Sequence, residues 1–283
     1  MVGRGGGAAV TVSAVIPCHN VARYVGDAIR SCAADVDEII VVDDGSTDEL
    51  AGALVGFENV TLISQPQRGV SAARNAGAER ATSEFLLFLD ADDLVGPGQL
   101  AAMAPGDGDD VVATGHVNTS LLGEVHDTHE LGPLRPDAFH ALLPFNLWPP
   151  HALLLRRELF ARLGGFRVSM RHHEDWELWL RLAASGARFR VVPGVHAIHR
   201  NRAGSASTNS AAMLSSALFV LAAAEAQHGC VECRRRAKAG RRAHRRHWLG
   251  LLGGALTTDI RELVQLVRAD PGALREVARR LWR

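Results

Sequence analysis

The sequence predicts an α/β protein with a mostly parallel sheet flanked by helices, followed by a helical C-terminal appendage. Short apolar runs rich in β-branched residues alternate with segments in which apolar residues recur at helical spacing. The alternation repeats at the pitch of strand–helix–strand units, which join parallel strands by right-handed crossovers. At 283 residues and 47% hydrophobic content, the chain is long and apolar enough to bury a sizeable core.

Each element of the first half follows from its own residues. A strand is expected where a β-branched apolar run ends at a turn residue, and a helix where apolar residues recur every three or four positions. Asn20 is well placed as the N-cap of the first helix, and Ser46 or Thr47 as that of the second. The expected strands are 10–16, 38–42, 60–64, 84–89 and 110–117, and the expected helices are 21–32, a segment after 47, and 70–81.

The second half is less regular. Residues 119–150 are rich in Pro, His and Leu and resist assignment. An apolar run from His151 leads into a short helix at 156–163, which a pair of glycines ends. The next helix begins near residue 174, and Gly186 closes it. One apolar face of this helix is expected to carry Trp176, Trp179, Leu180 and Ala183.

Three parts are expected along the chain. Residues 1–9 are glycine-rich and contain no long apolar region before a cleavage site, so they predict a flexible leader. Residues 10–208 would form the α/β domain, with a first half ending at residue 118 and a second half from 119 to 208. Residues 209–283 would form a helical, basic region, whose apolar stretch from Met213 is interrupted before it reaches the roughly 20 residues that span a bilayer.

Charge and cysteine content narrow the setting. The formal net charge is zero, yet residues 234–246, from Arg234 to Arg246, carry eight basic residues and no acid. This run is consistent with a solvated helix face or with peripheral contact at the inner face of a membrane, and no nucleic acid partner is expected. Four cysteines do not suggest a disulfide framework, which fits a cytoplasmic protein. Cys230 and Cys233 form an isolated C-x-x-C, which is a weak indication of a metal or redox site. The sequence leaves open whether the protein forms an oligomer.

Polar and acidic residues follow three of the predicted strands. They occupy residues 17–20 (PCHN), 43–46 (DDGS) and 90–93 (DADD). Parallel strands end at the same edge of a sheet, and ligands of open α/β sheets bind beyond that edge, so we expect these residues to form one site. The crowded carboxylates of residues 90–93 repel one another, which favours a cation beside them.

The motifs exclude two common nucleotide sites and favour a third kind. The chain contains neither G-x-x-x-x-G-K-[ST] nor a G-x-G-x-x-G after its first strand, so neither a P-loop nucleotidase nor a Rossmann dehydrogenase is supported. An acidic edge suits Mn²⁺ or Mg²⁺, which prefer oxygen ligands and leave positions for phosphate. Such an ion can stabilise the charge on a departing nucleoside diphosphate.

The chain also resembles the family 2 glycosyltransferases of the GT-A fold, from about Val12 to Ser207. The resemblance rests on six motifs in the family's order: VIPCHN, IIVVDDGSTD, GVSAARNAGAERA, FLLFLDADD, LLLRRELFARLGGF and HEDWELWLRLA. It implies a metal-dependent, inverting hexosyltransferase that uses a nucleoside diphosphate sugar, a UDP- or dTDP-sugar. The implied acceptor is a hydroxyl of a glycan, a lipid-linked or a small molecule, placed against the region from about residue 121 to 148 and the helix near 174.

The resemblance also implies roles for the strand-end residues. Asp90-Ala91-Asp92 matches the D-x-D motif, in which Asp92 would bind Mn²⁺ or Mg²⁺ directly and Asp90 would face the ribose and the metal shell. Asp93 is then an extra acid, with the N-cap of the following segment as an alternative role. The donor pocket would contain Pro17, Cys18, Asn20, Asp43, Asp44 reading the base, Arg74 near the phosphates, and Ala91.

Glu174 and Asp175 match the family's E-D motif, which implies that Asp175 is the catalytic base. A helix first turn and a nearby cation both keep the pKa of such a carboxylate low. An ionised carboxylate still suffices, because the hydroxyl proton becomes acidic as its oxygen bonds the anomeric carbon. The alternative is that the pair only caps its helix.

The chain departs from the family pattern in the stretch IHRNRAGSAS. Arg200 is kept, and Arg202 stands where the family has a histidine. Histidine ligation of the metal is therefore in doubt: both arginines would neutralise phosphates, and His196 or His199 is an alternative ligand. Two further classes stay open, a catalytically silent nucleotide-sugar binding protein and a nucleotidyltransferase that uses the same acidic edge.

Overall fold

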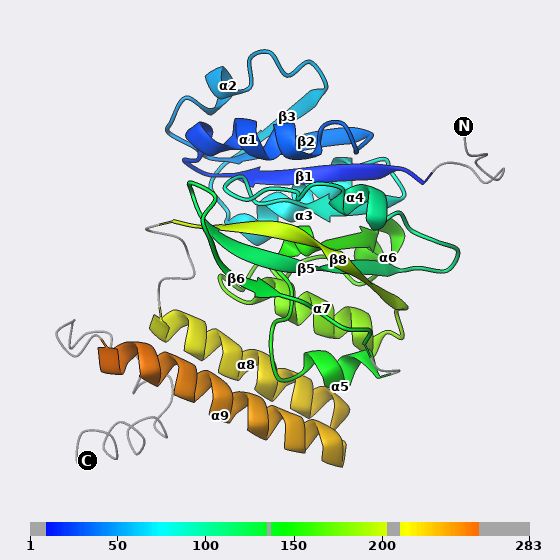
Figure 1. Cartoon of the computed structure of the whole chain (residues 1–283), viewed down its shortest axis with the longest axis vertical. Coiled ribbons are helices and arrows are strands. Elements are labelled where there is room, and N and C mark those ends of the chain that lie inside the picture. Colours follow the sequence, from blue (N-terminus) through cyan, green and yellow to red (C-terminus); the bar gives the residue numbers. More distant parts are fainter. Residues whose placement is uncertain (1–9, 135–136, 203–209, 255–283) are drawn as a thin grey trace. The chain divides into compact units, whose positions relative to one another are not determined.

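The structure is a computed structural model that describes residues 10–134, 137–202 and 210–254 (Figure 1). The chain forms two compact units. The first comprises residues up to 134 together with 148–169 and 185–201, and the second comprises 135–147, 170–184 and the chain from 202 onward. The expected leader, residues 1–9, lies outside the described residues.

The first unit is built on one mixed, eight-stranded sheet with the order β3-β2-β1-β4-β7-β5-β6, in which β8 pairs with β5. Strands β1 to β4 pair in parallel, β7 is antiparallel to both β4 and β5, and β8 is parallel to β5. The prediction of a mostly parallel sheet is thus confirmed at its core. The strands are β1 (Val12–Cys18), β2 (Glu38–Asp44), β3 (Val60–Gln65), β4 (Phe85–Phe88), β5 (Val111–Ser120), β6 (Val125–His129), β7 (Leu153–Arg156) and β8 (Phe189–Asn201).

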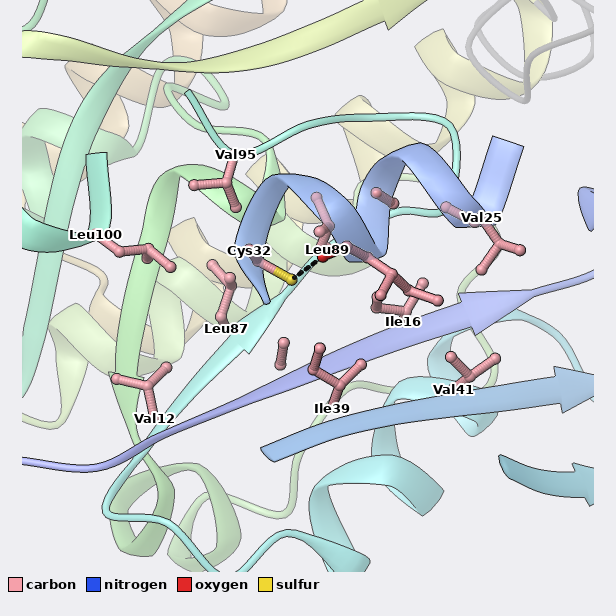
Figure 2. Close-up of a cluster of buried hydrophobic side chains, with 14 of the residues drawn as sticks. Val12, Ile16, Val25, Cys32, Ile39, Val41, Leu87, Leu89, Val95 and Leu100 are labelled. Atoms are coloured by element: carbon pink, nitrogen blue, oxygen red, sulfur yellow. Dashed lines mark hydrogen bonds between the residues drawn. The ribbon is translucent and has the colours of Figure 1, made fainter. Parts of the chain in front are cut away.

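Helices cover both faces of the parallel strands. On one face, Ile16 of β1 packs in the same core as Val25 of α1 (Figure 2). Ala14 and Ile29 belong to the same core. On the other face, the adjacent Val15 meets α3, because successive residues of a strand point to opposite faces. The helical segments of this unit are α1 (Ala22–Cys32), α2 (Leu50–Ala53), α3 (Val70–Arg80), α4 (Gln99–Ala102), the 3₁₀ turn η1 (Pro150–Ala152) and α6 (Arg157–Arg162).

The expected helix caps are wrong in both cases. The N-cap of α1 is Val21 and that of α2 is Glu49, and neither has a side-chain cap bond. Asn20 instead accepts hydrogen bonds from the backbone N–H and the hydroxyl of Thr47, and the Ser46 hydroxyl accepts the backbone N–H of Asn20. These side chains tie the loop after β1 to the loop after β2, which a cap assignment based on local sequence does not foresee.

The region from 119 to 150, which the sequence leaves unassigned, contains strand β6 and helix α5 (Ala138–Leu142). All five residues of β6 are exposed, so no apolar alternation marks it. Helix α5 has only five residues, fewer than two helical turns. Strand β8 was not expected either, and most of its residues are half-buried.

The second unit consists of α5, α7 (Glu174–Ala184), α8 (Ser210–His228) and α9 (Val231–Gly254). Helices α8 and α9 lie side by side (Figure 1), as the expected helical C-terminal region requires. The prediction that the tryptophans of α7 share its apolar face is confirmed, since Trp176 and Trp179 are fully buried. Among the helices in the described residues, none combines the length and apolar character that crossing a membrane requires.

The basic run of α9 is partly neutralised within the second unit. Arg235 and Arg236 form ion pairs with Glu232, with N–O distances of 2.6 Å. Arg241 pairs with Glu225 of α8 at 2.7 Å. Arg235 and Arg236 therefore stabilise the first turn of α9, and Arg241 links α9 to α8.

Candidate active site

In the first unit the ends of the parallel strands bring the predicted acidic residues together. Cys18, the last residue of β1, pairs in register with Asp43 of β2. Burial raises the pKa of the Cys18 thiol, and the negative charges of Asp43, Asp48, Asp90 and Asp92 raise it further. Carboxylates from two segments, at the end of β2 and after β4, therefore lie near the end of β1, which pairs with both strands.

Asp44 holds the loop between β3 and α3. Its carboxylate is buried, with 4% of the residue exposed. One oxygen accepts the Gln65 side-chain amide at 2.7 Å and the backbone N–H of Arg68 at 2.8 Å. The other accepts the backbone N–H of Gly69 at 2.7 Å. Any contact with a base would come in addition to this structural task.

The loops after β1 and β2 place the other residues of the expected donor pocket. Pro17 is buried and pairs with Val42 in the sheet. Asn20 is exposed and has a positive φ of 55°, a conformation that asparagine tolerates better than most residues. Asp43 accepts the backbone N–H of Ser46 at 2.8 Å. The polar side chains of residues 19 and 20 are thus exposed at the edge, whereas the side chains of residues 17 and 18 are buried in the sheet.

Arg74 of α3 lies against the D-x-D motif. Its guanidinium donates to Asp90 Oδ1 at 2.6 Å and lies over the ring of Phe166, 5.1 Å from the ring centroid. The Arg74 side chain is 3% exposed and that of Asp90 is 28% exposed. The adjacent Asn75 receives and donates hydrogen bonds with the backbone of Phe166. This buried arginine brings a positive charge to the site that the strand-end motifs alone do not provide.

Asp92 is partly exposed, and its backbone carbonyl accepts a hydrogen bond from the Arg200 side chain. Arg200 also donates to Asp27 of α1 at 3.2 Å and lies over the ring of Tyr24. Arg200 thus links the backbone of the D-x-D motif to α1. In the described part of the chain, no group of three converging Asp, Glu, His or Cys ligands includes Asp90 or Asp92.

Asp93 is buried, with 1% exposed, and does not cap the segment that follows. The capping alternative is wrong because its carboxylate accepts the backbone N–H of Arg200 at 2.7 Å and pairs with His199 Nδ1 at 3.0 Å. Burial lowers the pKa of His199, but its hydrogen bond to Asp93 and the charges of Asp93, Asp90 and Asp92 outweigh burial and raise it to about 9. His199 is therefore a cation at neutral pH, close to the D-x-D motif.

His151 completes this buried group, and the sequence does not indicate its role. Its Nδ1 lies 3.4 Å from Asp93 Oδ2, and the ring stacks on that of His199 with centroids 6.3 Å apart. Burial lowers the pKa of His151 to about 4, although the charge of Asp93 opposes the change. The fully buried imidazole is therefore neutral at neutral pH.

In the second unit, Asp175 stands in the first turn of α7. One of its oxygens accepts the backbone N–H of Trp176 at 2.7 Å, and the other accepts the side-chain amide of Asn146 at 2.8 Å. Hydrogen bonds from two N–H groups and the start of a helix both favour the ionised carboxylate. The neighbouring Glu174 is 8% exposed.

The residue before this pair has an unusual backbone. His173 has a positive φ of 56° and is 9% exposed. Non-glycine residues in this region cost free energy and persist where the surrounding structure holds them. Burial, followed by the charges of His244 and His172, lowers the pKa of His173 to about 3. The E-D pair is therefore preceded by a strained, neutral histidine, which is the first residue of the motif HEDWELWLRLA.

The predicted site residues are divided between the two units. Glu174, Asp175 and Arg202 belong to the second unit, and the other predicted site residues belong to the first.

A family model described as glycosyl transferase family 2 matches residues 13–161. The chain is 28% identical over 212 residues to the succinoglycan biosynthesis protein ExoU of Rhizobium meliloti, and the aligned region covers 64% of this chain and 59% of that protein. It is 30% identical over 210 residues to the pre-mycofactocin glycosyltransferase of Mycobacterium tuberculosis, and the aligned region covers 68% of this chain and 43% of that protein. The chain thus spans about half the length of these relatives.

The fold is similar to that of a solved structure. The crystal structure of S. aureus TarS residues 1–349 in complex with UDP-GlcNAc superposes with a TM-score of 0.64 at 19% identity, and covers 95% of this chain and 82% of that one. This similarity confirms the predicted fold class, an α/β fold of the GT-A type with a parallel core and a C-terminal helix pair.

Proposed function

Because the chain belongs to glycosyl transferase family 2, we propose that it transfers a sugar from a nucleoside diphosphate sugar to an acceptor hydroxyl. The observation that carries the proposal is the gathering of Asp43, Asp90 and Asp92 around the end of β1, with Arg74 bonded to Asp90. Carboxylates beside a buried guanidinium match a donor that brings a diphosphate and a divalent ion together.

The donor would lie over the ends of β1, β2 and β4. Asn20 is exposed there and available to a base or ribose, and the polar strand-end loops are tied together by hydrogen bonds that keep their shape. Asp44 would approach the base while it holds the loop before α3. The TarS complex with UDP-GlcNAc supports a uridine donor, with a dTDP-sugar as the alternative.

The residues at the D-x-D motif fit a hard divalent ion. Asp92 and Asp90 offer carboxylate oxygens, and both side chains are partly exposed. The remaining coordination positions of such an ion are commonly filled by phosphate oxygens and water. Asp92, with Asp90 beside it, would hold Mn²⁺ or Mg²⁺, which when bound neutralises charge on the departing nucleoside diphosphate. Arg74 and Arg200 supply positive charge from the protein, and Arg200 also fixes the backbone of Asp92.

Asp175 is proposed as the base that takes the acceptor proton. Its two oxygens are already oriented by Trp176 and Asn146, so an acceptor hydroxyl that reaches this carboxylate meets a positioned, ionised group. An ionised carboxylate suffices as the base when proton transfer is late, because the hydroxyl acidifies as its oxygen bonds the anomeric carbon. This arrangement favours a single displacement with inversion.

The experiment has two stages. A thermal-shift screen of UDP- and dTDP-sugars with and without Mn²⁺ identifies the donor, because a ligand that binds the folded state raises the melting temperature. Transfer from that donor is then measured for Asp175→Asn and for a matched control, Glu158→Gln, an exposed acid in the first turn of α6. We expect Asp175→Asn to keep donor binding and lose transfer, while the control keeps both.

The products separate the alternatives. Release of nucleoside diphosphate together with a glycosylated acceptor supports the proposal, whereas release of pyrophosphate identifies a nucleotidyltransferase. Donor binding with neither transfer nor hydrolysis, across the acceptor classes tested, identifies a silent binding protein. Wild-type turnover in Asp175→Asn would show that the base is another residue.

A further inference from the structure

The second unit contains a cluster of two thiols and an imidazole that lies outside the proposed active site residues. Cys230 immediately precedes α9, Cys233 lies in the first turn of that helix, and His140 lies in α5, some 90 residues earlier. His140 Nε2 is 3.2 Å from each Sγ, and the two Sγ atoms are 3.0 Å apart. Both cysteines are free. Three soft or borderline ligand atoms from two elements therefore point at one position.

The imidazole is held in the orientation that a ligand requires. His140 Nδ1 pairs with the Asp137 carboxylate, which also accepts the His140 backbone N–H at 3.1 Å. The His140 carbonyl accepts Arg236 Nη1 of α9 at 2.8 Å. A carboxylate on the far nitrogen of a histidine fixes its tautomer and ring direction, and is the usual outer partner of a metal-binding imidazole. With Nδ1–H donated to Asp137, the lone pair of Nε2 faces the thiols.

We propose that Cys230, Cys233 and His140 bind a zinc ion. The three ligand atoms form a triangle with sides of 3.0, 3.2 and 3.2 Å. An ion at Zn–S and Zn–N distances of about 2.3 and 2.0 Å sits above one face of such a triangle, which leaves a fourth tetrahedral position for water or another ligand. Thiolate and imidazole ligands select zinc over Mg²⁺ and Mn²⁺, so this site is chemically distinct from the carboxylates of the D-x-D motif.

A disulfide between Cys230 and Cys233 is the competing interpretation. A disulfide would involve only the two sulfurs and would not explain why Asp137 orients the His140 imidazole toward them. His140 Nε2 lies 3.2 Å from both sulfurs, so all three ligand atoms are within coordination distance of one ion. The geometry therefore favours the metal.

The ion would fasten a short helix. An isolated helix as short as α5, with five residues, is not stable in water. Zinc would join it to the start of α9 through ligands from both. The carbonyl of Leu142 at the end of α5 accepts a hydrogen bond from Trp176 Nε1 of α7 at 2.9 Å. A zinc ion that holds α5 in place would therefore also support α7, the helix that carries the E-D pair. The binding proposal itself does not depend on the proposed function.

The first test uses the full wild-type chain. Protein purified under reducing conditions without chelator is expected to contain one zinc per chain. After chelation, added Zn²⁺ should raise the melting temperature by several degrees, whereas Mg²⁺ should not reproduce the effect. Added Co²⁺ should give the thiolate-to-metal absorption and the intense visible bands of a tetrahedral site. Reduced, folded protein that binds neither Zn²⁺ nor Co²⁺ would overturn the proposal.

Variants locate the site. Cys233→Ser and His140→Gln should lose the zinc, whereas Cys32→Ala, which removes a buried free cysteine of α1, should keep it. Asp137→Asn retains all three ligands, and its zinc affinity should fall about 10- to 100-fold. A full zinc content in both ligand variants, or unchanged affinity in Asp137→Asn, would contradict the assignment, and the wild-type measurements decide the question if a variant does not fold.

Discussion

The substitution Gly77→Ala tests the packing that places Arg74 at the active site. Gly77 lies in α3, one turn after Arg74. A Cβ at residue 77 would lie 2.3 Å from Val15 Cγ1 and 3.1 Å from Val42 Cγ2, both on fully buried strand residues. Ordinary carbon contacts are about 3.5 to 4.0 Å, so the new methyl overlaps β1 by more than 1 Å. The helix must move away from the sheet, or Val15 must leave its rotamer.

The magnitude follows from two opposing terms. Overpacking of a core costs about 1–3 kcal/mol, and the overlap at Val15 places this site toward the upper end. Replacing glycine by alanine in a helix returns up to about 1 kcal/mol. We expect a net loss of about 2 kcal/mol in the free energy of unfolding, which lowers the melting temperature by roughly 4–8 °C. Donor affinity should fall as well, because a displaced α3 carries Arg74 away from Asp90.

The assay is chemical denaturation with two matched comparisons. Gly52→Ala in α2 places its Cβ 4.0 Å from the nearest atom, on Glu49, and should be neutral or slightly stabilising. Val15→Ala removes the methyl groups that clash, so its effect and that of Gly77→Ala should not add in the double variant. Wild-type stability in Gly77→Ala, or strict additivity with Val15→Ala, would refute the reasoning.

Three other predictions concern buried charge. Burial lowers the pKa of His151 to about 4, so between pH 6.5 and 4 the unfolded state binds a proton that the folded state does not. The free energy of unfolding should therefore fall by about 3 kcal/mol as the pH drops from about 6.5 to 4. Equal denaturation midpoints at pH 7 and 4.5 would contradict this. The pKa of His199 is raised to about 9, so the stability that its pair with Asp93 contributes is complete below about pH 6.5 and should be lost as the pH rises through 9. Denaturation of His199→Gln checks this, because the free energy of unfolding of that variant should lack this loss between pH 6.5 and 9. Asp44→Asn turns an amide toward a buried backbone N–H and should cost about 2 kcal/mol by denaturant titration, whereas Asp35→Asn, at an exposed site, should cost nothing measurable.

Local sequence was sufficient for the elements that make up the parallel core. Strands β1, β2 and β4 are apolar on both faces because helices cover both, so each appears as a continuous apolar run. Their order along the chain then implies which ends share an edge of the sheet. The parallel direction of the strands places Asp43, Asp90 and Asp92 at one edge, and the sheet order β2-β1-β4 brings them to the end of β1.

Other elements carry no comparable signal. Strand β6 is exposed along its whole length, and α5 is too short to show a helical period. Polar residues at strand ends were harder still, because the same side chain can cap a helix or bond a distant loop. Asn20 bonds Thr47, and Asp93 bonds the backbone of Arg200, more than 100 residues away.

The isolated C-x-x-C shows the same limit at the level of a site. Two cysteines three residues apart are too common to indicate a metal, and His140 lies 90 residues before the first of them. Only the packing of α5 against α9 brings the imidazole to the thiols. Asp137, the N-cap of α5, is held against the imidazole by the first turn of that helix.

The class of fold and the edge of the sheet where the acids gather could be predicted from the family motifs, from hydrophobic periodicity and from strand direction. The tertiary structure decided which partner each polar side chain takes. Asp44 holds a loop, Arg74 lies on Asp90, His199 is charged beside Asp93, and His140 faces two thiols. Such choices depend on atoms brought within about 3 Å by segments far apart in the chain, a distance at which hydrogen bonds and charges act and which no local pattern encodes.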